Sequence, residues 1–258
     1  METIIAMNNE AVLLIEQAKL QLALELLAQA LSSVQGEANR IAGQNEHDQR
    51  LGKRSETADV YSVLDTKIVQ QRRRVFIERQ GIYCSSSIPA ADACEQCCND
   101  FVYKHPIQTN IELLKDTMDG VYILCIILMF NLGLTHHLIA MEHKIGMGTS
   151  EEEAEKERRR IGKHLKNALR LYEMGFHMQM NGFVAMDITY ALAMVNNCAV
   201  IYKALKRRRR AKKFYQHLLS SLVFLVEGGE AENIDEPDGF LMNASRLILR
   251  QNDVAAAA

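Results

Sequence analysis

The chain has 258 residues, of which 48% are hydrophobic and 24% are charged, the balance of an ordinary folded protein that can bury a sizeable core. Its formal net charge of -2 argues against a nucleic-acid binder that works through bulk charge. With only 3 Pro and 14 Gly, strands and tight turns are poorly supplied with the residues they need. The composition therefore predicts an all-α fold.

No segment has the pattern of an export signal, because the N-terminus carries Glu2 and lacks a basic region followed by a small-residue cleavage site. The most apolar run, Val121 to Leu134, is shorter than the roughly 20 residues that span a bilayer, so we expect a core helix and no membrane association. The 6 cysteines are then expected to be reduced thiols inside the cell. These features predict a cytoplasmic protein, with the nucleus as the alternative location.

Residues 3–34 carry apolar side chains at helical spacing and predict a first helical hairpin. From residue 35 to residue 100 the composition becomes polar, charged and small, which predicts a flexible insert without a core of its own. This insert holds Cys94, Cys97 and Cys98. A zinc site needs a second well-spaced ligand pair, so free thiols are the favoured interpretation.

Residues 101–250 are expected to form an extended segment, two further hairpins and a closing element, followed by a tail at 251–258. Residues 101–107 are expected to be extended because Pro106 excludes a helix through their centre. The predicted helices are 109–143, 151–181, 185–206 and 208–227, with a closing element at 240–249.

An internal repeat relates the first and last hairpins. Asn8-Asn9-Glu10-Ala11, followed by Ala23 and Leu27, superimposes without a gap on Asn196-Asn197-Cys198-Ala199, followed by Ala211 and Tyr215. The middle of the chain repeats both halves, with an insertion between them, in Asn131-Leu132-Gly133 and in Ala168 and Tyr172. Small residues let two antiparallel helices approach closely, and the bulky residue one turn later fills the space between neighbouring hairpins.

These residues resemble the tetratricopeptide (TPR) family. Its pattern of Asn-Leu-Gly…Tyr and then Ala…Phe…Ala is matched by Asn131-Leu132-Gly133 and by Tyr202, Ala211 and Tyr215. The resemblance covers the three hairpins, but long insertions replace the uniform repeat spacing. The whole layout is also similar to a group of TPR-like proteins encoded in diatom genomes. That similarity implies the same TPR-like, α-solenoid-like fold and adds no function.

The resemblance implies that the first helix of each hairpin lines a concave groove. Carried onto this sequence, the groove positions are Ile5, Asn8, Val12, Ile15, Ile127, Phe130, Leu134, His137, Ala193, Asn196, Val200 and Lys203. A mostly apolar lining predicts a helical or extended ligand. One hypothesis makes this ligand internal, with residues 101–107 lying against the groove, and the competing one assigns the groove to a partner protein.

A clamp for a peptide's terminal carboxylate is not expected. Asn9, Asn131 and Asn197 fit the family's usual asparagine position, but Lys203 is the only cation among the groove positions.

The densest charge run consists of Lys206, Arg207, Arg208, Arg209, Arg210, Lys212 and Lys213. It resembles an import signal or a nucleic-acid patch, and it also falls where the repeat places a solvated turn. His136, His137, Glu142 and His143 could suggest metal ligands, but no H-E-x-x-H arrangement is present, so no metal is expected there. His136 fills the aromatic position of the TPR pattern and is expected to be a packed histidine.

Phosphate-loop and nucleophile-elbow motifs are missing, so we predict no enzyme, no cofactor and no metal. The leading function is an intracellular protein–protein interaction scaffold that binds a protein or peptide. The alternative is an RNA- or chromatin-associated protein that uses residues 206–213.

Overall fold

The computed structural model describes residues 1–49, 82–84, 100–110, 114, 117–145, 150–180, 187–229, 232 and 234–245. Over these residues the fold is mostly helical, as the composition predicts. The helices are α1 (Glu2–Glu16), α2 (Leu20–Gln49), α4 (Met118–Ile145), α5 (Glu151–Met180), α6 (Ile188–Ala204) and α7 (Arg208–Glu227). A further helix over residues 237–245 is called the closing helix here. Two short strands, β1 (Ile82–Cys84) and β2 (Ile107–Thr109), pair antiparallel with Tyr83 opposite Gln108.

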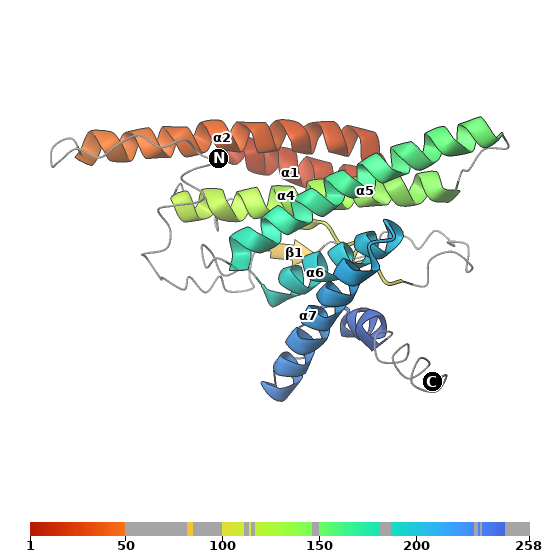
Figure 1. The fold of residues 1–258 in the computed structure, drawn as a ribbon. Helices are drawn as coiled ribbons and strands as arrows, with labels where there is room; N and C mark the ends of the chain where they lie inside the picture. Colours follow the sequence, from red (N-terminus) through yellow and green to blue (C-terminus); the bar gives the residue numbers. More distant parts are fainter. Residues whose placement is uncertain are drawn as a thin grey trace.

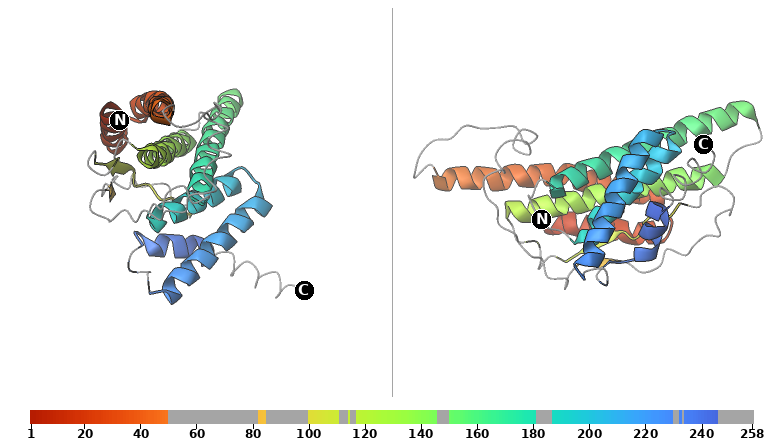
Figure 2. Two further views of the ribbon diagram at one scale, coloured as in Figure 1. Left: turned by 90° about the vertical axis from the view of Figure 1, so that its left-hand side faces the viewer. Right: turned by 60° about the horizontal axis from the view of Figure 1, so that its bottom comes forward.

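Consecutive helices pack in pairs, α1 with α2, α4 with α5 and α6 with α7, while α2 also contacts α4 and α5 contacts α6. Figure 1 shows α1, α2 and α4 running side by side, with α5 crossing them obliquely and with α6 and α7 below. In the left view of Figure 2 the yellow segment around β2 lies against α1 and α4, on the side away from α2.

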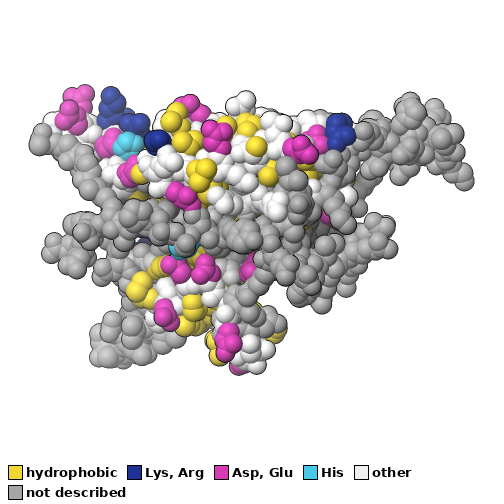
Figure 3. Space-filling model, turned by 180° about the vertical axis from the view of Figure 1, so that it is seen from behind, with side chains coloured by type: hydrophobic (Ala, Val, Ile, Leu, Met, Phe, Trp, Pro, Cys, Tyr) yellow, Lys and Arg dark blue, Asp and Glu magenta, His cyan; other side chains and the backbone are white. Residues whose placement is uncertain are grey.

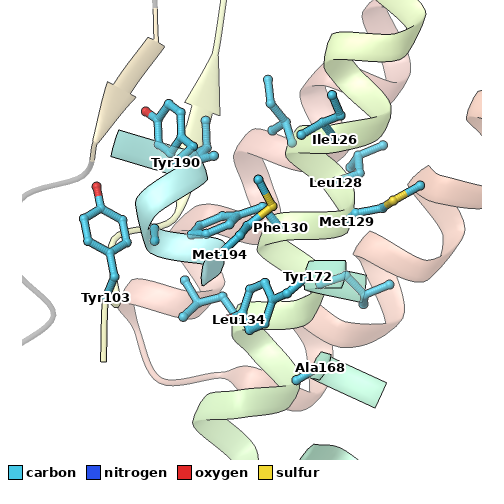
Figure 4. Packing of buried hydrophobic residues seen from close by; sticks show 14 of the residues in the cluster. Tyr103, Ile126, Leu128, Met129, Phe130, Leu134, Ala168, Tyr172, Tyr190 and Met194 are labelled. Carbon is cyan, nitrogen blue, oxygen red and sulfur yellow. The ribbon is translucent and has the colours of Figure 1, made fainter. Parts of the chain in front are cut away.

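Helix α4 forms the centre of the core. Residues Met118–His143 are long and apolar enough to cross a membrane, but 83% of their most apolar window is buried inside this fold. A core helix passes the same test, and the structure uses α4 in that way. Phe130 and Tyr172, from α4 and α5, are both completely buried and face each other with ring centroids 5.8 Å apart (Figure 4).

The small residues of the repeat lie at helix crossings. Ala11, Ala168 and Ala199 are each 0% exposed. A Cβ atom added to Gly133 would lie 3.1 Å from the ring of Tyr172, tighter than ordinary packing allows. Close approach of paired helices is therefore the physical reason for small side chains at these positions.

Two predicted boundaries are wrong. The flexible insert was expected to begin at residue 35, but α2 continues to Gln49. At the start of this extension the helix is amphipathic, since Val34 and Ala38 are buried on one face and Glu37 pairs with Arg40 at 2.7 Å on another. Residues 82–84 of the predicted insert form β1, whereas 50–81 and 85–99, with Cys94, Cys97 and Cys98, lie outside the described residues.

The helix predicted to begin at residue 109 begins at Met118, because Thr109 belongs to β2. The extended conformation expected over 101–107 thus reaches two residues further. The remaining helices lie close to their predicted ranges, and α7 covers 208–227 as expected.

Candidate functional site: an asparagine ladder on an extended segment

Residues 100–110, which we call the clamped segment, run across α1, α4, α6 and the closing helix. Four residues of this segment, at positions 101, 103, 107 and 109, are held through their backbone by asparagine side chains. We call these side chains the asparagine ladder, and they are Asn8, Asn9, Asn131, Asn196, Asn197 and Asn243.

The first clamp holds the C-terminal half of the segment. Asn9 accepts a hydrogen bond from the amide of Thr109 at 3.0 Å and donates one to its carbonyl at 2.8 Å. Asn131 does the same at Ile107, with both distances 2.8 Å. Asn8 adds a donor to the Ile107 carbonyl at 3.0 Å, and its own amide oxygen accepts from Asn131 at 2.9 Å.

The second clamp repeats this arrangement on the N-terminal half. Asn197 takes the role of Asn9, bonding the amide and the carbonyl of Tyr103 at 3.0 Å each. Asn243 takes the role of Asn131, accepting from the Phe101 amide at 3.0 Å and donating to its carbonyl at 2.6 Å. Asn196 takes the role of Asn8, donating to Phe101 at 3.0 Å and accepting from Asn243 at 2.6 Å.

The carboxamide group suits this task because it carries a donor and an acceptor side by side, matching the N–H and C=O of one extended residue. Five of these amides are deeply buried, with Asn8, Asn131, Asn196 and Asn197 at 0% exposure and Asn243 at 1%. A buried amide without partners costs about 1–3 kcal/mol. The ladder is therefore stable only when an extended backbone lies on it.

Side chains of the segment add a second layer of contacts. Tyr103 is fully buried, with its ring stacked on Phe240 at a centroid distance of 5.8 Å and its hydroxyl 3.3 Å from the Asp235 carboxylate. Figure 4 shows Tyr103 on the same side of α4 as Phe130, whose ring centroid is 6.3 Å away. These contacts tie the segment to the main core.

Phe101 meets Phe240 edge to face at 5.3 Å and lies directly over Gly239. A Cβ atom at Gly239 would come within 2.4 Å of the Phe101 ring. The closing helix can therefore approach the segment only because this position is glycine.

One ion pair lies at the end of the segment, and one histidine–carboxylate contact lies in its middle. Lys203 contacts both carboxylate oxygens of Asp100 at 2.6 Å. His105, between the two clamps, lies 3.1 Å from Glu236 and has no ladder asparagine opposite it in the described part of the chain. The asparagine ladder thus forms hydrogen bonds with the backbone of residues 101, 103, 107 and 109, but not with that of residue 105.

The predicted groove residues divide into two groups. Asn8, Asn196 and Lys203 contact the clamped segment directly. Phe130 packs beside Tyr103 of the segment, with ring centroids 6.3 Å apart. The remaining eight positions are buried in the fold: Ile5, Val12, Ile15, Ile127, Leu134, His137, Ala193 and Val200. Burial lowers the pKa of His137 to about 4, so this side chain is neutral inside the core. The hydrogen bonds and the ion pair to the segment thus come from the amides and from Lys203.

Sequence reasoning treated Asn9, Asn131 and Asn197 as family positions rather than as ligand contacts, and it missed Asn243. The available signal was chemical. Asn131 lies inside one of the most apolar stretches of the chain, where a primary amide needs a buried partner.

The basic run lies at the turn between α6 and α7 and at the start of α7. All seven of its cations are exposed. Arg210 lies near the Glu173 carboxylate, to which the Tyr202 hydroxyl donates a hydrogen bond. Arg210 donates to the Tyr202 hydroxyl at 3.0 Å. Residues 206–210 line a shallow hollow of about 600 Å³. Figure 3 shows another face, on which acidic side chains are scattered among hydrophobic and polar ones.

His136 of α4 packs against His164 of α5, as expected for a packed histidine. The Nδ1 atoms of His136 and His164 lie 2.9 Å apart, and His143 lies 2.6 Å from Glu157. Burial, helped by the charge of His164, lowers the pKa of His136 to about 4. Within the described ranges no group of three or more His, Cys, Asp or Glu side chains is arranged to hold a metal.

Comparisons with protein-family models, with curated proteins and with solved structures find no match to this chain. Its function is therefore argued from the contacts within the chain itself.

Proposed function

We propose that this protein is an intracellular protein–protein interaction scaffold whose asparagine ladder binds extended polypeptide through its backbone. The observation that carries the proposal is the pair of three-asparagine clamps, which bond both backbone groups of Phe101, Tyr103, Ile107 and Thr109. Primary amides do not titrate and are poor nucleophiles, so a site built from them recognises its ligand without transforming it. On this proposal the clamped segment is the scaffold's internal ligand.

The proposal includes a TPR-like arrangement of the three helix pairs. Two features support it. The first helix of each pair, α1, α4 and α6, supplies ladder residues, and the second helices α2 and α5 contact the next pair. An intracellular location is supported by Cys125 and Cys198, which are free thiols.

The test releases the segment after folding. Recognition sites for a specific protease are placed within 85–99 and directly after Asn110, so that the chain folds intact and cleavage at both sites leaves residues 100–110 held only by non-covalent contacts. A fluorescent peptide of residues 100–110 is then added, and its binding is followed by anisotropy. We expect saturable binding to the doubly cut protein and none to the uncut protein.

The matched control is the doubly cut protein with Asn131→Ala and Asn197→Ala, which should release the peptide faster and bind the probe more weakly. If the cut protein keeps its own segment and admits no probe, or loses its helical circular dichroism as the segment leaves, the segment is a fixed part of the core. Either result overturns the scaffold proposal.

A second candidate function is binding of RNA or chromatin through Lys206–Lys213. It is favoured by one observation, the cluster of seven exposed cations at the turn before α7 and in its first turns. Phosphate contacts of this kind weaken steeply with salt, by roughly one power of the salt concentration per neutralised phosphate. RNA binding that is steep in salt and lost in Arg207–Arg210→Ala would support this candidate, and salt-independent or absent binding would remove it.

A further inference from the structure

The side chains of the clamped segment occupy defined environments. These environments indicate which other sequences could bind to the asparagine ladder in its place. The Phe240 ring meets Phe101 edge to face and is stacked on Tyr103. The Tyr103 hydroxyl reaches Asp235 at 3.3 Å. Val102, between them, is buried at 8% exposure. This half of the site therefore selects an aromatic residue, an apolar residue and then tyrosine.

The other half selects branched aliphatic side chains. Ile107 is 0% exposed and Thr109 is 4% exposed. The Thr109 hydroxyl oxygen is buried without a hydrogen-bond partner in the described residues. A valine has the same shape without the unpaired hydroxyl, so the site accepts valine at this position better than the threonine that occupies it.

Between the halves the site tolerates proline. Pro106 has no N–H to donate, and the ladder reads only the odd-numbered residues around it. Its ring also biases His105 towards an extended conformation, which keeps the two halves at the distance that the clamps require. At the N-terminal end, Lys203 pairs with Asp100 at 2.6 Å and so favours an acidic residue before the first aromatic one.

We propose that the ladder's partner is an extended segment of another protein with the pattern acidic–aromatic–apolar–Tyr–x–x–Pro–(Ile or Val)–x–(Val or Thr), which replaces residues 100–109 and runs from the closing helix to α1. This proposal rests on the proposed function, because it requires that the internal segment can be exchanged. It adds to that function the chemistry by which the partner is recognised.

The experiment measures competition by synthetic peptides for the doubly cut protein. The reference is the peptide of residues 100–110. A Thr109→Val peptide should bind at least about fivefold more tightly, since it removes an unpaired buried hydroxyl. A Tyr103→Phe peptide should bind about three- to tenfold more weakly, since it leaves Asp235 without its phenol partner.

Backbone reading is tested separately with a matched pair. N-methylation at Ile107 deletes a ladder donor and should abolish binding at the highest concentration used. N-methylation at Lys104 should change affinity less than threefold or so, because the Lys104 amide makes no hydrogen bond within the described residues.

The outcomes distinguish a failure of the partner pattern from a failure of the proposed scaffold function. If a scrambled peptide of the same composition competes as well as the reference, the ladder reads backbone alone, and the pattern proposed here is wrong while the scaffold stands. If no peptide enters, both proposals fail. If the uncut chains dimerise in sedimentation and the N-methyl peptide pair shows no difference, a second copy is the occupant, and the partner pattern is overturned.

Discussion

Asn131→Ala is the sharpest perturbation of the ladder because Asn131 serves two buried groups that have no other partner among the described residues. It accepts from the Ile107 amide at 2.8 Å and donates to the Asn8 amide oxygen at 2.9 Å. The Ile107 carbonyl keeps the hydrogen bond from Asn8 at 3.0 Å. Truncation therefore leaves one donor and one acceptor unpaired in a region that is 0% exposed.

Each orphaned group costs about 1–3 kcal/mol, and alanine returns about 0.5 kcal/mol as the better helix former. The expected net loss is about 2–5 kcal/mol in the free energy of unfolding, against a total of about 5–15 kcal/mol for a typical domain. Urea denaturation followed by circular dichroism measures this difference. Gln21→Ala is the control, since it removes an exposed amide bond to Glu25 and should change stability by less than about 0.5 kcal/mol.

Hydrogen exchange locates the same effect in the chain. The Ile107 amide should lose protection in Asn131→Ala, whereas the Tyr103 amide, held by Asn197 in the other clamp, should lose much less. A variant that matches the Gln21→Ala control in stability, with an unchanged Ile107 exchange rate, would show that the ladder does not hold the segment in solution. The argument for a backbone-reading site would then fail.

Two further predictions concern the closing helix and pH. Gly239→Ala should lower the urea midpoint and speed exchange of the Phe101 amide, because the new Cβ would collide with the Phe101 ring at 2.4 Å; Gly36→Ala, with nothing within 4 Å, should leave stability equal or raise it by up to about 1 kcal/mol. Burial lowers the pKa of both His136 and His137 to about 4, so the unfolded chain, with pKa values near 6.5, binds more protons. Stability should fall by up to about 1.4 kcal/mol per pH unit for each histidine as pH drops from 6.5 to 4, and urea midpoints that stay constant over this range would contradict the assignment.

The helices could be predicted from sequence where burial imposes a period. Helix α7 alternates buried Ala211, Tyr215, Leu218 and Leu222 with charged residues, and its predicted range agrees with the structure. The end of α2 could not be predicted in this way, because the sequence from residue 35 to residue 49 carries few apolar residues and shows no helical period. A polar sequence indicates exposure to solvent, but it does not distinguish an exposed helix from a loop.

The site was harder to predict for a different reason. The resemblance to the TPR family implied that Asn8 and Asn196 line a groove, and Pro106 indicated that the segment is extended. The pairing of the two depends on contacts across about a hundred residues, such as those between Asn9 and Thr109, 100 positions apart. No local pattern records such a contact. A buried amide needs a hydrogen-bond partner, so the sequence indicated that such a contact exists but not which residue makes it.

The gap in the ladder at His105 falls where the segment passes from one helix pair to the next. Residues on one edge of an extended strand recur about every 6.6 Å. Within each clamp the ladder advances by one such step, from Phe101 to Tyr103 and from Ile107 to Thr109. Between the clamps the segment crosses from α6 to α4, and α5 packs against both of these helices. The strand therefore advances by four residues there, about 13 Å, and Pro106 in this interval costs the ladder no hydrogen bond.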